Sequence, residues 1–199
     1  MRTVRFTLLI GALALIACGP RTEQLTFQAR VSDLRRPSNA LAKNKGPDQF
    51  VDTTAPGRLL DPVVEVKPVA RKDADWSTPE GATAAIVSAN LAGDGSWVVE
   101  NYSPEEREEA RRGLGDPAVA ARTWNYYRNM GKVVMMGWAE VRGFRLIFLQ
   151  GREEDGDATF VVVALKKTAD GWRQSNALAD TDEFEVIWTA LHTGGIRAM

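Results

Sequence analysis

Few side chains in this sequence can carry out catalysis. The 199 residues include one histidine, His192, and one cysteine, Cys18. A Ser-His-Asp triad would need His192, yet no Gly-x-Ser-x-Gly turn precedes it, and Gly194 and Gly195 follow it closely. Metal sites built from several histidines or cysteines are excluded by these counts. We therefore interpret His192 as a structural cation near a helix C-terminus, and we expect no metal and no cofactor.

Two further patterns resemble ligand sites only superficially. The acidic run at residues 153–157 could attract calcium, but it lacks EF-hand spacing, and we interpret it as a hairpin turn. The glycine pairs at 93 and 95 and at 113 and 115 lack the spacing and the lysine of a phosphate-binding loop. Neither pattern predicts a bound ligand.

Residues 1–18 have the order of features that is typical of a secretory signal. Arg2 and Arg5 precede an apolar run at residues 6–16, which is too short to cross a bilayer as a stable helix. Small Ala17 then stands directly before Cys18. We therefore predict that residues 1–17 are a signal peptide and that the mature chain begins at Cys18.

The segment Leu15-Ile16-Ala17-Cys18 resembles the lipobox of bacterial lipoproteins. The resemblance implies that the Cys18 thiol receives diacylglycerol and that its amine, exposed by cleavage, is acylated. Two or three acyl chains give durable anchoring, whereas one chain gives only marginal membrane binding. A plain signal peptide with a chance cysteine is the alternative. Gly19 stands where inner-membrane retention would favour aspartate, so we expect the outer membrane, facing the periplasm, if the source is Gram-negative.

Charge argues against nucleic acid as a partner. The chain has 25 basic and 26 acidic side chains, which gives a formal net charge of −1. The charge is uneven, because residues 19–73 carry ten basic and seven acidic side chains. A basic segment beside a lipid anchor could associate with anionic headgroups, and a solvated linker is the alternative.

Composition predicts a border near residue 75. Residues 19–74 contain two aromatic side chains and six prolines, whereas all tryptophans and tyrosines lie beyond residue 75. We therefore predict a mostly disordered tether at 18–75, a domain at 76–193 and a disordered tail at 194–199. Residues 25–31 and 63–67 alternate apolar and polar side chains and could pair with the domain as edge strands.

Helix signals dominate the first part of the predicted domain. A capping-box spacing from Ser77 to Glu80 predicts a helix that ends at Gly93. Ser103-Pro104 starts a second helix over residues 107–112. We interpret its many glutamate and arginine side chains as a solvated face. Asp116-Pro117 starts a third helix, which ends at Gly131.

The second part changes to strand patterns. Residues 132–141, 144–152, 158–167 and 172–178 are rich in β-formers and are joined by short connections, which favour antiparallel neighbours. Thr181 then caps an amphipathic helix over residues 182–192. A fifth strand is the competing interpretation of that segment, because Phe184, Val186 and Trp188 also alternate.

This order of elements, with Asp170-Gly171-Trp172 late in the chain, is similar to the nuclear-transport-factor-2-like (cystatin-like) superfamily. The resemblance implies an α+β roll in which N-terminal helices pack on a curved four-stranded antiparallel meander. Members use the enclosed cavity for small ligands, for acid/base catalysis or as a packed core. The expected final helix departs from the usual ending of that fold in a strand.

A cavity of that kind could bury a carboxylate and raise its pKa. Glu140 shares a strand face with Trp138, and Arg145 lies just past the following turn. Tyr126 and Tyr127, from the third helix, could face the same space. We name these five residues as a possible pocket. The alternative is an exposed cross-strand ion pair between Glu140 and Arg145, with the aromatic residues as core or pocket wall.

Two hypotheses about function follow. The first is a non-enzymatic lipoprotein, held on the membrane through Cys18, whose domain binds an envelope protein or a small apolar ligand. The second is a cavity enzyme, a hydrolase or isomerase that acts through a buried carboxylate. The scarcity of catalytic motifs favours the first.

Overall fold

The chain forms an α+β fold around a single antiparallel sheet. The structure, a computed structural model, describes residues 22–36, 38–152, 156 and 158–199. The strands are β1 (Glu23–Arg30), β2 (Phe50–Glu65), β3 (Val134–Val141), β4 (Phe144–Arg152), β5 (Ala158–Thr168), β6 (Gly171–Gln174) and β7 (Ile196–Ala198). They run in the order β6-β5-β4-β3-β2-β1-β7, and every neighbouring pair is antiparallel. The predicted signal peptide, Cys18 and the acidic run, apart from Gly156, lie outside the described residues.

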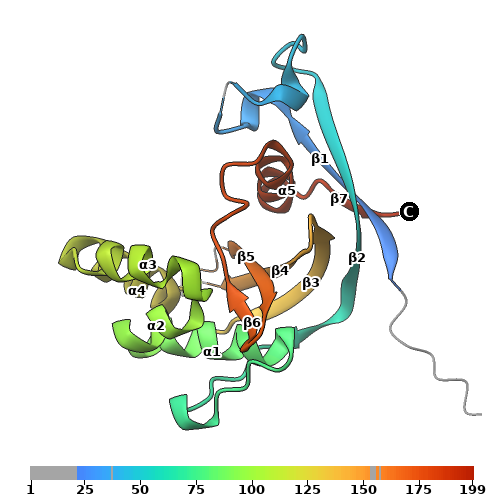
Figure 1. Ribbon diagram of the computed structural model, residues 1–199. Coiled ribbons are helices and arrows are strands. Elements are labelled where there is room, and N and C mark those ends of the chain that lie inside the picture. The colour runs from blue at the N-terminus through green and yellow to red at the C-terminus, as the bar shows by residue number, and fades with distance from the viewer. Residues whose placement is uncertain (1–21, 37, 153–155, 157) are drawn as a thin grey trace, which may run out of the picture.

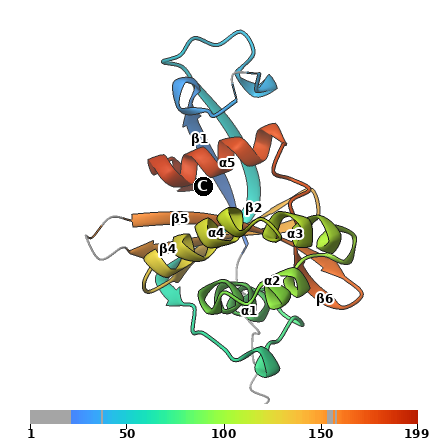
Figure 2. The same cartoon turned by 90° about the vertical axis from the view of Figure 1, so that its left-hand side faces the viewer.

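Helices cover both faces of this sheet. The α-helices of the described chain are α1 (Pro79–Ala92), α2 (Gly95–Asn101), α3 (Arg107–Leu114), α4 (Pro117–Asn129) and α5 (Asp182–Thr193). Helices α1 to α4 gather at one end of the molecule, and α5 lies inside the curve of β1 and β2 (Figure 1). In the turned view, α5 lies on one side of β4 and β5 while α1 and α2 lie on the other (Figure 2).

Strand β4 explains the two-sided core. Successive side chains of a strand point to opposite faces of its sheet. Leu146 and Phe148 belong to the cluster that packs against α5, whereas Ile147 and Leu149 belong to the cluster that packs against α1. All four side chains are fully buried, so β4 is the central strand of the core.

The helix boundaries follow capping signals in the sequence. Thr78, rather than the expected Ser77, caps α1, since its hydroxyl accepts a hydrogen bond from Gly81 N at 3.1 Å. Gly93 ends α1 with a φ of 66°, a left-handed conformation that favours glycine. Thr181 caps α5, so residues 182–192 are helical and the competing strand interpretation is wrong.

The sheet is larger than the sequence indicated. An α+β fold was predicted and is confirmed, but the expected four-stranded sheet is wrong because β1, β2 and β7 extend it to seven strands. The expected strand at 172–178 is also shorter, since β6 ends at Gln174. β6 lies at one edge of the sheet, where few neighbours support a longer strand.

The segment predicted as a mostly disordered tether contains two of these strands. Leu25, Phe27 and Ala29 alternate with more exposed neighbours and are buried in the core. β1 pairs with β2 on one side and with β7 on the other, so residues 194–199, predicted as a disordered tail, also contain a strand. The pairing of β2 with β3 shifts register between Leu59 and Val64, which accommodates Pro62.

The first prediction concerns β1. Replacing Phe27 with alanine should lower the free energy of unfolding by about 3–5 kcal/mol, because the ring is fully buried and packs edge-on against Phe148. Gln24→Ala, at an exposed position of the same strand, should change it by less than about 0.5 kcal/mol. Urea unfolding followed by tryptophan fluorescence measures both. Equal, small effects would restore the interpretation of this segment as a tether.

Candidate functional site

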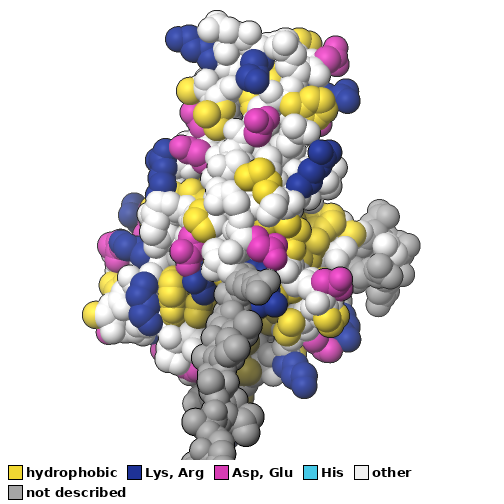
Figure 3. Space-filling view, turned by 90° about the vertical axis from the view of Figure 1, so that its right-hand side faces the viewer, with side chains coloured by type: hydrophobic (Ala, Val, Ile, Leu, Met, Phe, Trp, Pro, Cys, Tyr) yellow, Lys and Arg dark blue, Asp and Glu magenta, His cyan; other side chains and the backbone are white. Residues whose placement is uncertain are grey.

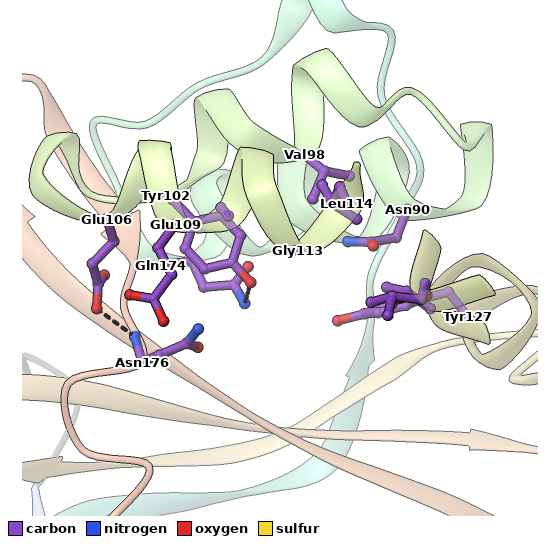
Figure 4. Close-up of a pocket in the computed structure, with 13 residues that line it drawn as sticks. Asn90, Val98, Tyr102, Glu106, Glu109, Gly113, Leu114, Tyr127, Gln174 and Asn176 are labelled. Carbon is purple, nitrogen blue, oxygen red and sulfur yellow. Dashed lines mark hydrogen bonds between the residues drawn. The ribbon is translucent and has the colours of Figure 1, made fainter. Parts of the chain in front are cut away.

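A cavity of about 270 Å³ lies between α1 to α4 and the end of β6 (Figure 4). We call it the helical cavity. Its lining is mixed: Val98, Leu114 and Val119 are apolar, and the polar members are Asn90, Tyr102, Glu106, Glu109, Thr123, Tyr127, Gln174 and Asn176. These residues come from all four helices and from the chain that follows β6.

Two tyrosines approach the cavity from opposite sides. Tyr102 lies at the C-terminal end of α2 and Tyr127 lies in α4, and both hydroxyls point into the open space (Figure 4). Gln174 Nε2 donates a hydrogen bond to the Tyr102 hydroxyl oxygen at 3.1 Å. Burial raises the pKa of Tyr102, with a partial offset from a hydrogen bond of Asn176, and burial also raises the pKa of Tyr127. Both side chains are therefore neutral phenols at pH 7.

Asn90 supplies an unused acceptor to the same space. Its side chain is 3% exposed and points into the cavity (Figure 4). The amide nitrogen donates to Ile86 O at 2.8 Å, whereas Oδ1 is buried and has no hydrogen-bond partner within the described residues. A buried acceptor without a partner costs about 1–3 kcal/mol. A ligand that brings a donor to Oδ1 would recover that free energy.

Glu106, just before α3, is hydrogen-bonded to the chain that follows β6. Oε2 accepts a hydrogen bond from Ser103 Oγ at 2.7 Å. Oε1 accepts from Ser175 Oγ at 3.1 Å and from Asn176 N at 2.9 Å. With three donors already engaged, Glu106 positions the wall of the cavity.

Glu109 lies three residues further along the chain, and its carboxylate has no such hydrogen bonds within the described residues. It lines the cavity, and within the described part of the chain it forms neither an ion pair nor a hydrogen bond. The lining includes no lysine, arginine or histidine. The cavity therefore offers spare oxygen acceptors and negative charge with no cation to balance them.

The structure separates the five residues that we predicted as a pocket. Tyr127 lines the helical cavity, whereas Trp138 and Arg145 line a different groove, between β2, β3 and the start of α1. Tyr126 is exposed, and its hydroxyl donates to Phe160 O at 3.0 Å. Glu140 is exposed and forms an ion pair with Arg145, its partner in the β3–β4 register. The geometry therefore fits the alternative of an exposed cross-strand ion pair.

His192 lies in the last turn of α5, where a cation interacts favourably with the helix dipole. Its ring stacks on Trp188 with a centroid separation of 3.8 Å, and Nδ1 lies 2.8 Å from Trp188 O. Nothing in this arrangement assigns chemistry to the imidazole. Within the described ranges, no group of three or more His, Cys, Asp or Glu side chains could hold a metal ion.

We did not predict most residues of the helical cavity, although α3 carries a signal for them. Glu106, in the 3-10 turn Pro104–Glu106 just before α3, follows the same helical spacing as Glu109, Ala110, Gly113 and Leu114, whereas Glu108 and Arg111 form an exposed ion pair. Counting that period would have separated the glutamates that line the cavity from Glu108, which does not. The contributions of Asn90 and Gln174 depend on long-range packing and leave no comparable local pattern.

No protein-family model, curated protein or solved structure matches this chain. Within the described residues, no helix is both long enough and apolar enough to cross a membrane.

The second prediction concerns Tyr127. Because its pKa is higher in the folded than in the unfolded chain, its contribution to stability is complete below about pH 10 and is lost as the pH rises further. Tyr127→Phe should therefore reduce the alkaline loss of unfolding free energy by up to about 1.4 kcal/mol per pH unit. Urea unfolding at several values above pH 9 compares the slopes. Identical slopes would show that Tyr127 ionises as readily in the folded chain.

Proposed function

We propose that this chain is a lipid-anchored protein of the bacterial envelope whose domain binds a small cationic ligand in the helical cavity. The observation that carries the binding proposal is the buried Asn90 Oδ1, which lacks a partner within the described chain and faces an open cavity. The lipobox resemblance at Cys18 supports the anchor.

Hydrogen-bonding capacity selects the chemistry of the ligand. The amide nitrogens of Asn90 and Gln174 each have one of their two N–H groups engaged, with Ile86 O and with the Tyr102 hydroxyl oxygen, whereas Asn90 Oδ1 and the Glu109 carboxylate accept no hydrogen bond within the described residues. A ligand that donates N–H groups and carries positive charge matches this set. The tyrosine rings add favourable surfaces for a cation.

Size and polarity refine the ligand further. A volume of about 270 Å³ is near the lower end for ligand pockets, so the cavity suits a short alkyl ammonium, free or carried by a lysine of a partner protein. The sequence led us to expect an apolar small ligand. The two glutamates and two tyrosines of the lining favour a polar one instead.

The geometry favours binding over the hydrolase or isomerase alternative. A catalytic acid of the predicted kind would be a buried carboxylate, but Glu140 is exposed and paired with Arg145. Glu106 accepts three hydrogen bonds. Glu185 is buried, but its carboxylate accepts from Asn39 Nδ2 at 2.8 Å and pairs with Arg36 at 3.2 Å. Each of these carboxylates is therefore already ion-paired or hydrogen-bonded within the chain.

We also propose that residues 76–191 form a variant of the nuclear-transport-factor-2-like roll. The curvature of the sheet and the position of four helices before β3 support this relationship (Figure 1). β1, β2 and β7 would then be additions to the roll, and α5 would replace its usual final strand.

The third prediction tests the ligand class with three probes that share a five-carbon chain: pentylammonium, pentanol and pentanoate. Pentylammonium should shift the side-chain amide signals of Asn90 and Gln174 in NMR spectra of the purified protein, and pentanoate should not. Glu109→Gln should weaken pentylammonium binding by about fivefold, the equivalent of about 1 kcal/mol for an exposed charge.

Glu108→Gln is the matched control, because Glu108 lies on the same helix but pairs with Arg111 outside the cavity. It should leave the affinity unchanged. Equal shifts with all three probes, or equal losses in the two glutamine variants, would contradict the cationic ligand.

The fourth prediction tests the anchor. The membrane-extracted protein should have the mass of residues 18–199 plus a glyceryl group and two or three acyl chains, and Cys18→Ala should remain uncleaved or lose this lipid. Intact-mass spectrometry distinguishes these products. An unmodified chain that starts beyond Cys18 would refute the lipoprotein assignment.

A further inference from the structure

A second hollow, of about 330 Å³, lies between β2, β3 and the first turn of α1, next to Thr22. We call it the N-terminal groove. Its walls include the apolar side chains of Leu60, Val64, Met135 and Trp138, together with two arginines, Arg58 and Arg145, and one acidic residue, Glu80. The lining therefore carries one more positive than negative charge, and apolar walls with such an excess suit an amphiphilic anion.

Arg145 is held against aromatic rings, and Arg58 has no ion-pair partner among the described residues. The Arg145 guanidinium lies 4.3 Å from the centroid of the Trp138 ring and 5.5 Å from that of Trp172, which holds it against the sheet. One of its nitrogens donates to Glu140, but Nε is buried and has no partner within the described chain. Arg58 lies opposite Trp138 in the β2–β3 register and forms no ion pair with any described residue.

Beside the groove, β2 exposes two consecutive valines. Val63 and Val64 are 47% and 51% exposed. Consecutive strand residues normally point to opposite faces, and the register shift that ends at Val64 allows both to remain on the surface. Figure 3 shows apolar side chains close to the point where the described chain begins.

The length of the chain to the anchor limits where this surface can lie. Three residues separate Cys18 from Thr22, so the four backbone steps between them span at most about 14 Å when fully extended. The headgroup region on one side of a bilayer is itself about 5–8 Å thick. If acyl chains on Cys18 lie in the bilayer, Thr22 and the groove beside it must stay near the membrane surface.

We propose that the N-terminal groove, together with Val63 and Val64, docks on the bilayer that holds the anchor. Arg58, which has no ion-pair partner among the described residues, would contact lipid phosphate groups, and the valines would enter the interface. The inference rests on the proposed lipidation of Cys18. Helices α2 to α4 lie on the opposite side of the molecule from β2, so docking in this orientation leaves the helical cavity open to the aqueous side (Figure 1).

The fifth prediction tests this orientation with the lipidated protein in vesicles of phosphatidylethanolamine and phosphatidylglycerol. Because Cys18 is the only cysteine and its thiol would carry lipid, Val64→Cys can be labelled uniquely with a fluorophore. Nitroxide-labelled headgroups should quench this probe at least threefold more than a probe on Ser38→Cys. Ser38 is exposed and lies in the connection between β1 and β2, beyond the opposite end of β1 from Thr22.

Arginine variants test the phosphate contact. In the Val64→Cys background, Arg58→Gln should reduce quenching, whereas Arg122→Gln, at an exposed position of α4, should not. Equal quenching at residues 64 and 38, or equal effects of the two arginine variants, would overturn the docking surface.

Vesicle flotation separates this result from failure of the anchor. A protein that floats with vesicles but shows equal quenching refutes the docking surface alone. A protein without acyl chains that does not float refutes the anchor and, with it, the docking that rests on the anchor.

Discussion

The two-sided burial of β4 is the constraint on which the rest of the structure depends. Leu146 and Phe148 pack towards α5, and Ile147 and Leu149 pack towards α1, so one strand holds both helical layers in place. Each fully buried large apolar side chain contributes about 1.5–3 kcal/mol relative to an exposed one, before conformational entropy is subtracted. Both candidate binding surfaces lie at the margins of this core, where its packing gives way to polar groups.

Polar contacts then join the parts that the core leaves unconnected. Glu106 links the start of α3 to the chain after β6, and Glu185 of α5 links to the β1–β2 connection through Arg36 and Asn39. Removing one partner from such a buried network is costly, because the remaining group stays desolvated. These carboxylates stabilise the fold, and Glu109 is left available for a ligand.

The two proposed surfaces divide the molecule by function. The N-terminal groove, with Arg58 and Arg145, lies next to Thr22 and would face the bilayer. The helical cavity, with Asn90 and Glu109, lies among α1 to α4 and would face the aqueous side. If Cys18 is lipidated as proposed, the short link to the anchor would favour one orientation, since the start of the described chain would be held within about 14 Å of its lipid.

Local patterns were sufficient wherever the cause is local. The capping residues Thr181 and Asp116 mark helix starts and Gly93 marks a helix end, because each depends on neighbours only a few residues away. Export, indicated by the signal features up to Cys18, stays a prediction. The alternation at residues 25–31 indicated an edge strand, but only the tertiary structure placed β1 between β2 and β7. Phe27 pairs with Ile196, about 170 residues away, and is buried against Phe148. The tertiary structure also decided which glutamates face a cavity and which face water, because that depends on the helix or strand packed opposite each one.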